Sequence, residues 1–167
     1  MQRRTFLTRS LATLVAGSVA SSLSGCGFRL RGLDTPMLAL DALALDAAAS
    51  DLTPVVREAL ESAGTRIDDQ APLRLNLGHE QFHEAALTHG DAGSQDVELR
   101  LTAPFSVQRR ASDAYLLDQQ QLDVVTTITV SSDDLLAQDD IRAEAREQLR
   151  RDAARQLLER LRPLAEQ

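Results

Sequence analysis

Residues 97–107 read Val-Glu-Leu-Arg-Leu-Thr-Ala-Pro-Phe-Ser-Val, the clearest alternating run in the chain. Apolar side chains occupy every second position, and polar or small side chains lie between them. Because the side chains of a strand point alternately to its two faces, this run predicts a strand with one face in the core. Pro104 has no backbone N–H, which predicts a bulge or an edge position at that residue.

The segment that follows predicts a hairpin and then a long helix. Residues 109–114 form a loop, and residues 115–130 return as a strand with one apolar face. From Asp133-Asp134 onward the apolar period lengthens to about four, and Pro163 predicts the end of this helix. The expected apolar stripe of the helix consists of Leu135, Ala145, Leu149, Ala153, Leu157 and Leu161.

Two strands and a shorter helix are predicted upstream. Residues 38–46 and 73–78 alternate between apolar and polar side chains, as strands do. Between them, Thr53-Pro54 predicts an N-cap followed by proline in the first turn, and Gly64 predicts the end of the helix.

The predicted order of elements is therefore β-α-β-β-β-α, a mixed α/β chain. If the first two strands pair in parallel, the helix between them makes a right-handed crossover. The simplest arrangement is an α+β sandwich, with two helices packed on one face of a four-stranded mixed sheet.

The N-terminal residues have the features of a bacterial lipoprotein signal. Arg3, Arg4 and Arg9 precede a short apolar run, which is shorter than the roughly 20 residues that a membrane-spanning helix needs. Residues 23–26 read Leu-Ser-Gly-Cys, the form of a lipobox, and Cys26 is the single cysteine of the chain. We therefore expect acylation of Cys26, which would anchor the protein to membrane lipids.

This signal also predicts the domain organisation and the location. We expect a signal peptide over residues 1–25, a lipidated tether over 26–36 and a single domain over 37–167. No aspartate follows Cys26, as is typical of an outer-membrane address, with the domain facing the periplasm or lying inside a barrel. Arg3-Arg4 fits either the twin-arginine or the general export route.

Charge limits the partners of the mature chain. The whole chain has a net charge of −7, and loss of residues 1–25, which hold three arginines and no acid, lowers it to −10. Such an acidic surface argues against nucleic acid as a partner.

One motif has the form of a catalytic metal site. His79-Glu80-Gln81-Phe82-His83 matches H-E-x-x-H, which binds zinc when both histidines lie on one face of a helix. Here the motif continues an alternating strand, where residues four apart are separated by about 13 Å. We therefore interpret it as a solvated strand end and keep a small zinc peptidase using His79, Glu80 and His83 as the alternative function.

No other group of residues predicts catalysis or a cofactor. The chain lacks a nucleophile elbow and has too few glycines for a phosphate-binding loop. Arg109-Arg110 in the hairpin loop is a candidate contact for lipopolysaccharide phosphates, although a solvated hairpin loop is the simpler interpretation and the one we favour. We expect a protein that is not an enzyme and has no cofactor.

The start of the mature chain resembles a known family. Residues 26–32 read Cys-Gly-Phe-Arg-Leu-Arg-Gly, similar to the start of the LptE family of lipopolysaccharide-assembly lipoproteins. Residues 136–140 and 152–158 resemble the opening and the middle of that family's last helix. The resemblance departs at Gln138, where the family tends to have lysine, and at residues 88–91, where its loop is often basic.

This resemblance implies a role and a partner. LptE-like proteins plug the lumen of the outer-membrane barrel LptD and help lipopolysaccharide reach the outer leaflet. The resemblance also implies two helices over a four-stranded sheet, and it leaves direct lipopolysaccharide binding open. A generic envelope lipoprotein with another partner is a third hypothesis.

Overall fold

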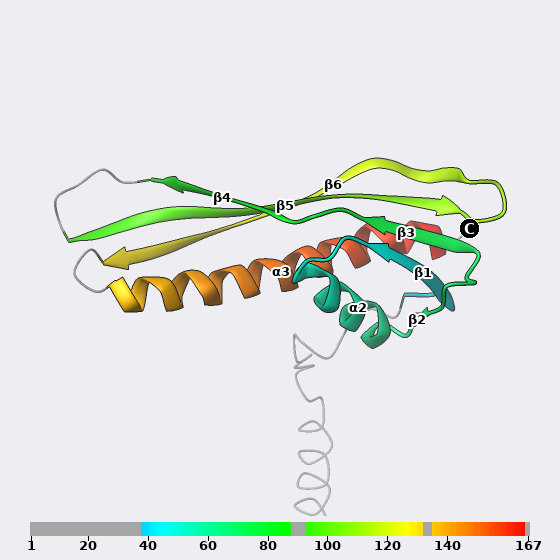
Figure 1. Cartoon of the computed structure of the whole chain (residues 1–167), viewed down its shortest axis with the longest axis horizontal. Coiled ribbons are helices and arrows are strands. Elements are labelled where there is room, and N and C mark those ends of the chain that lie inside the picture. The colour runs from blue at the N-terminus through cyan, green and yellow to red at the C-terminus, as the bar shows by residue number, and fades with distance from the viewer. Residues whose placement is uncertain (1–37, 88–92, 132–134, 166–167) are drawn as a thin grey trace, which may run out of the picture. The chain divides into compact units, whose positions relative to one another are not determined.

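The computed structural model describes residues 38–87, 93–131 and 135–165, which form two helices and six strands (Figure 1). The helices are α2 (Leu52–Ser62) and α3 (Leu135–Ala165). The strands are β1 (Ala42–Ala47), β2 (Arg66–Ile67), β3 (Leu73–Leu77), β4 (Gln81–Ala86), β5 (Ser94–Arg109) and β6 (Ala114–Ser131).

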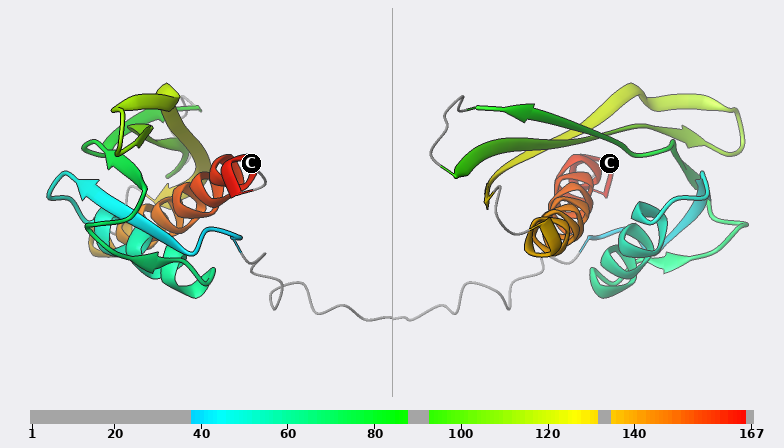
Figure 2. Two further views of the ribbon diagram at one scale, coloured as in Figure 1. Left: turned by 90° about the vertical axis from the view of Figure 1, so that its right-hand side faces the viewer. Right: turned by 60° about the vertical axis from the view of Figure 1, so that its left-hand side comes forward.

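All six strands belong to one mixed sheet. β1 pairs in parallel with β2 and β3, whereas β5 pairs antiparallel with β3, β4 and β6. β3 and β4 lie along the same edge of β5, one after the other, and β6 runs along its other edge. Both helices lie on one side of the sheet, and α3 follows its long direction (Figures 1 and 2).

The core lies between the sheet and the helices, where the sequence predicts it. The alternating residues of 97–107 are buried, and so are Leu149, Ala153, Leu157 and Leu161 of α3. Leu52, Val56 and Leu60 of α2 join the same cluster. The mixed sheet with two helices on one face is therefore confirmed.

The predicted number of four strands is wrong. β2 has only two residues, too few to produce an alternating pattern. β4 is mostly exposed, and Phe82 is its one large apolar side chain, so it carries little apolar alternation. Both strands are held by their neighbours in the sheet rather than by a buried face, so the apolar pattern did not predict them as separate strands.

The junction between β3 and β4 explains the position of Pro104. β3 pairs with residues 105–109 of β5 and β4 with residues 97–102, so Ala103 and Pro104 lie opposite the gap. The N–H of Gly78 donates to the carbonyl of Pro104 at 2.8 Å. Because the N and C=O of one strand residue point the same way, the missing donor of Pro104 faces this gap. Register shifts follow at once, between Phe105 and Gln108.

The predicted helix ends need three corrections. α2 begins at Leu52 with Asp51 in the N-cap position, and the Thr53 hydroxyl instead donates to the carbonyl of Ala48 at 2.7 Å. α3 continues two residues past Pro163, because the fixed φ of proline is helical and only the last turn remains. Leu135 of the expected stripe is exposed.

The remaining boundaries follow the prediction more closely. Gly64 ends α2 with a φ of 89°, a conformation that glycine adopts without strain. The first strand begins at Ala42 rather than at residue 38, although Leu38 is buried in the core. Asp133-Asp134, predicted to open α3, lies outside the described residues.

Candidate functional site

The hairpin between β5 and β6 forms one wall of a pocket at one end of the sheet. The pocket has a volume of about 510 Å³ and is lined by Pro72, Leu73, Arg109, Arg110 and Ala111. The N–H of Arg110 donates to the carbonyl of Pro72 at 2.8 Å, which fixes the hairpin against the start of β3. The predicted contact pair Arg109-Arg110 therefore borders a largely apolar floor.

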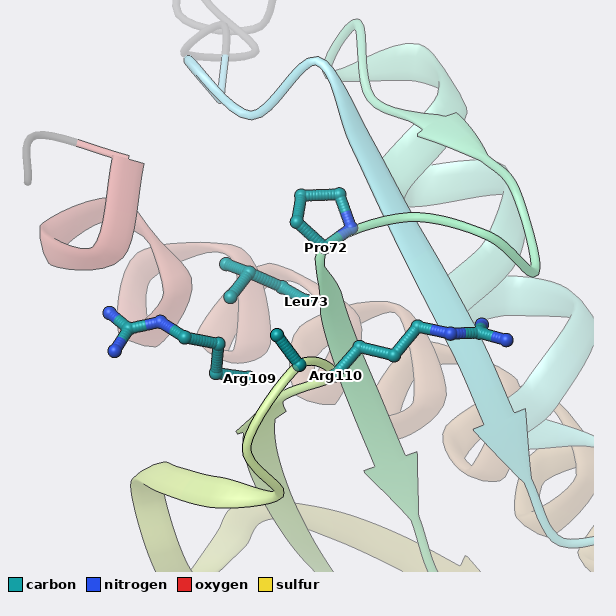
Figure 3. Close-up of a pocket in the computed structure, with 5 residues that line it drawn as sticks. Pro72, Leu73, Arg109 and Arg110 are labelled. Atoms are coloured by element: carbon teal, nitrogen blue, oxygen red, sulfur yellow. The ribbon is translucent and has the colours of Figure 1, made fainter.

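The two guanidinium groups of this pocket are free to meet an anion. Both side chains are exposed, and within the described residues neither lies in an ion pair. They extend to opposite sides of the pocket rather than converging on one point (Figure 3). Nearby Arg74 is already bound to Asp113 at 2.9 Å, so it adds no free cation.

The H-E-x-x-H motif is not arranged as a metal site. Its first two residues lie in the connection between β3 and β4, and His83 lies in β4. Both histidines are exposed. Within the described parts of the chain, no three His, Cys, Asp or Glu side chains gather closely enough to hold a metal ion. The alternative of a zinc peptidase is therefore unsupported.

Glu80, which would be the general base of that motif, is held by an arginine instead. Arg150 donates to its carboxylate through Nε at 3.0 and 3.2 Å and through Nη2 at 3.1 Å. The two side chains are only 10% and 15% exposed. Both oxygens of Glu80 are thus engaged by one guanidinium group, the arrangement of a structural ion pair.

The same arginine belongs to a row of cations that connects α3 to β4. Arg142 and Arg146 lie 3.4 and 3.3 Å from the carboxylate of Glu84, and Arg150 also reaches Asp51 at 3.0 Å. The guanidinium groups of Arg146 and Arg150 lie 5.7 and 5.4 Å from the ring centre of Phe82. These contacts fix the edge strand over the helix. We call them the Arg–Glu row.

The Arg–Glu row was not predicted, although the sequence carries a signal for it. Residues 142, 146 and 150 are all arginine and lie four apart, so they share one face of the helix. Their partners Glu80 and Glu84 lie in and directly after the H-E-x-x-H motif, which we interpreted as a solvated strand end, so no contact with the last helix was predicted there.

The side chain of Gln138 takes part in two hydrogen bonds at the start of α3. Its side-chain NH₂ donates to the carbonyl of Ser131, and its oxygen accepts from Arg142 Nη1 at 3.0 Å. An amide both donates and accepts, whereas lysine has no acceptor for the arginine. Gln138 therefore fixes the start of α3 and offers no charge to a ligand.

Apart from exposed Val125, the face of the sheet opposite the helices is mainly polar and internally hydrogen-bonded. Asn76 Nδ2 donates to Ser106 Oγ at 3.0 Å, Arg100 pairs with Asp123 at 3.1 Å, and Thr129 donates to Asp96 at 2.7 Å. We call this surface the outer sheet face. No helix of the described part is long and apolar enough to cross a membrane.

Comparison with protein families identifies the chain. The model of LptE, described as lipopolysaccharide-assembly, matches residues 40–161. This chain belongs to the LptE family. The match covers the described domain from before β1 to Leu161, four residues before the end of α3, so the family assigns the chain a role in lipopolysaccharide assembly. No curated protein sequence matches it.

Solved structures of lipoproteins share the fold. Rare lipoprotein B from Shewanella oneidensis is 22% identical, with a TM-score of 0.57 over 72% of this chain and 92% of that one. An uncharacterized lipoprotein B from Nitrosomonas europaea is 14% identical, with a TM-score of 0.60 over 84% and 94%. A minor lipoprotein from Acinetobacter baumannii is 17% identical, with a TM-score of 0.56 over 74% and 91%.

The predicted lipidation site, Cys26, lies outside the described residues, as do the predicted signal peptide and tether. Residues 88–91, where the resemblance to LptE departs, are also outside them. Of the predicted site residues, the structure thus places Arg109 and Arg110 together at the pocket and separates His79 and His83 from any metal-binding group.

Proposed function

We propose that this LptE-family chain is a lipid-anchored outer-membrane protein that occupies the lumen of an LptD-like barrel. In that position it would help the barrel assemble and support lipopolysaccharide transport to the outer leaflet. It would act as a structural partner and not as an enzyme, and acylated Cys26 would hold it at the membrane.

The outer sheet face is the observation that carries this proposal. The lumen of a large membrane barrel is polar, so a plug needs a polar exterior whose groups are already paired. The hydrogen bonds of Asn76, Arg100 and Thr129 provide such a surface over one side of the sheet. The apolar side chains of β5 are buried against α3, so the plug would enter the lumen with a closed core.

Lipopolysaccharide contact is proposed at Arg109 and Arg110. Guanidinium groups pair well with phosphate, and these two are not neutralised by carboxylates in the described residues. Gln138 supplies no cation, so Arg109 and Arg110 are better candidates for lipopolysaccharide contact than position 138.

Purification of the acylated chain from outer membranes tests the main proposal. We expect a β-barrel protein to co-purify, and we expect Cys26→Ser to lose acylation and to leave the membrane fraction when the barrel is absent. Recovery of Cys26→Ser in the outer membrane of a barrel-deficient strain would disprove the anchor. Purification without any barrel would disprove the partner and favour a generic envelope lipoprotein.

A further inference from the structure

β6 has one free edge. It pairs with β5 alone, so no strand of the described residues covers its other side. Because backbone groups alternate in direction along a strand, every second residue of β6 points its N–H and C=O towards this edge. Asp123 is one of them, because its N–H donates to the side chain of Gln156 and not to β5. The same alternation places Val125, Thr127 and Thr129 on the edge, since the pairing with β5 has no register shift in this part.

Two glutamines of α3 cover the ends of this stretch. Gln156 binds both backbone groups of Asp123, because its oxygen accepts from the N–H at 3.0 Å and its NH₂ donates to the C=O at 3.4 Å. Gln138 donates to the carbonyl of Ser131 at the other end. Between these two contacts, the outward N–H and C=O groups of the three intervening edge residues have no partner in the described part of the chain. We call residues 125–129 the open edge.

The open edge lacks the features that usually protect an unpaired strand. Exposed edges are normally short, charged, interrupted by proline or a bulge, or covered by another segment. β2 has two residues, and β4 has six and is fixed by the Arg–Glu row. β6 has 18 residues, and residues 124–131 contain no charged side chain, no proline and no glycine. This segment consists mostly of valine and threonine, which favour strands, so the open edge is suited to pair with a further strand.

The size of the open edge indicates which kind of partner binds it. A strand of five residues extends about 17 Å, which is a small contact. Stable complexes bury about 1,200–2,000 Å² in total, and a few backbone hydrogen bonds give only a modest net stabilisation. The open edge alone is therefore too small to recruit a free partner, and this includes a second copy of the chain. Its occupant must already be held close by other contacts, which raise the effective concentration of the added strand.

The proposed function supplies such a partner, and the inference rests on it. A barrel that encloses the domain holds its own segments beside β6. The strands of a closed barrel wall have both edges paired, so the wall itself has no free edge for β6. A segment of the barrel protein that leaves the wall and enters the lumen does have free backbone groups. The side chains of Val125, Thr127 and Thr129 are exposed on the outer sheet face, which the proposal already places towards the lumen.

We infer that an extended, uncharged segment of the barrel partner adds to the sheet as a strand beside residues 125–129 of β6. Its backbone pairs with the outward N–H and C=O groups of the open edge. An apolar or β-branched side chain of the added strand packs on Val125, which is 51% exposed in the chain alone. The plug and the barrel are then joined through backbone hydrogen bonds as well as through the side chains of the outer sheet face.

Hydrogen–deuterium exchange of the full acylated chain, with and without the co-purified barrel, tests this contact. The even-numbered residues between 124 and 130 point their amides towards β5 in either state, so they serve as an internal reference. The amides of Val125, Thr127 and Thr129 are open in the chain alone. We expect these three amides to exchange at least about ten-fold more slowly in the complex, because backbone hydrogen bonds protect amides from exchange.

Two substitutions of Thr127 separate backbone pairing from simple contact. Thr127→Pro removes an N–H that β5 does not use, and its ring lies where the added strand would pair, so the protection of Val125 and Thr129 should be lost. Thr127→Ala keeps the N–H, so the protection should remain. Gln121→Pro, on the same edge but beyond Gln156, is the matched control and should leave the protection unchanged. Urea unfolding shows whether each variant is folded, and the wild-type comparison decides the inference if a proline variant is not.

Several results would overturn the inference. Equal exchange of the three amides with and without the barrel would show that no strand adds at the open edge. Protection in the chain alone that rises with its concentration would assign the open edge to a second copy. Protection that persists in folded Thr127→Pro would assign it to burial by side chains. Co-purification is the separate measurement of the plug proposal: if no barrel is recovered, both proposals fail, whereas a recovered barrel without protection supports the plug and excludes the added strand.

Discussion

Gly78 lets β3 and β4 share one edge of β5. A Cβ at this position would lie 2.6 Å from Cγ and 3.2 Å from Cδ of Pro104. Contacts this short force either the proline ring or the backbone to move. The absence of a side chain at Gly78 and the absence of an N–H at Pro104 thus produce one feature, the close junction between the two strands.

We expect Gly78→Ala to destabilise the domain by about 1–3 kcal/mol, the usual range for overpacking. Urea unfolding of the variant measures this loss. Pro104→Ala removes both ring atoms of the contact, so the double variant should lose less stability than the two single variants together. Wild-type stability of Gly78→Ala would show that the junction is looser than described.

The two histidines of the H-E-x-x-H motif should contribute little to the stability of the domain. His79 and His83 are exposed, so His79→Ala and His83→Ala should each change stability by less than about 0.5 kcal/mol. Neither histidine should be needed for metal content, because the described side chains form no metal-binding group. Stoichiometric zinc in the purified protein, lost in either variant, would restore the peptidase hypothesis.

At the scale of elements, the Arg–Glu row compensates for the thin packing of β4. The strand has one partner in the sheet, β5, and its apolar contact with the core is through Phe82. Arg142, Arg146 and Arg150 extend from α3 to its carboxylates and its ring. An edge strand rich in polar residues is thereby fixed without a hydrophobic face.

Arg150→Met tests how much this row contributes. The substitution keeps most of the aliphatic length but leaves Glu80, only 10% exposed, without its cation, so we expect a loss of about 2–4 kcal/mol. Arg151→Met is the matched control one residue away, because its pair with Glu147 is exposed and 3.8 Å long, and should cost less than about 0.5 kcal/mol. Thermal or urea unfolding of both variants gives the comparison. Equal stabilities would mean that β4 is held by its ladder with β5 alone.

At the scale of the whole molecule, the proposed plug depends on a closed core beneath the sheet. Leu101 lies at the centre of that core, fully buried, paired with Phe82 on one side and Val124 on the other. Glu98, three residues earlier, lies on the outer sheet face, and its one ion pair within the described residues is with Arg100, at 3.8 Å. The two residues therefore distinguish the inner from the outer face of the sheet.

Leu101→Asp should destabilise the domain by several kcal/mol, because it buries a carboxylate without a partner. Glu98→Ala should change stability by less than about 0.5 kcal/mol. If the domain is a plug, Leu101→Asp should also lower the amount of assembled barrel, measured in outer membranes. Normal melting of Leu101→Asp would contradict the assigned inner face. Unfolding with normal barrel levels and lipopolysaccharide export would contradict the assembly role.

The sequence itself determined the parts of this protein that bury a continuous apolar face. Residues 97–107 and the stripe of α3 repeat their apolar residues at the period of a strand and of a helix, so burial could be inferred from spacing alone. Gly64 also marked the end of α2, because its requirement for a positive φ is local. The sequence also identified Arg109 and Arg110 as a candidate contact, but it could not predict the pocket that they border.

Only the tertiary structure decided the rest. β2 and β4 form because β1 and β5 offer unpaired edges, and no pattern within their own residues requires it. Glu80 is a salt-bridge partner because α3, 70 residues later in the chain, brings Arg150 to it. Arg109 and Arg110 border a pocket because the hairpin after β5 meets the start of β3, where the N–H of Arg110 donates to the carbonyl of Pro72. Contacts between segments distant in sequence leave no periodic trace in either segment, so the folded chain alone shows them.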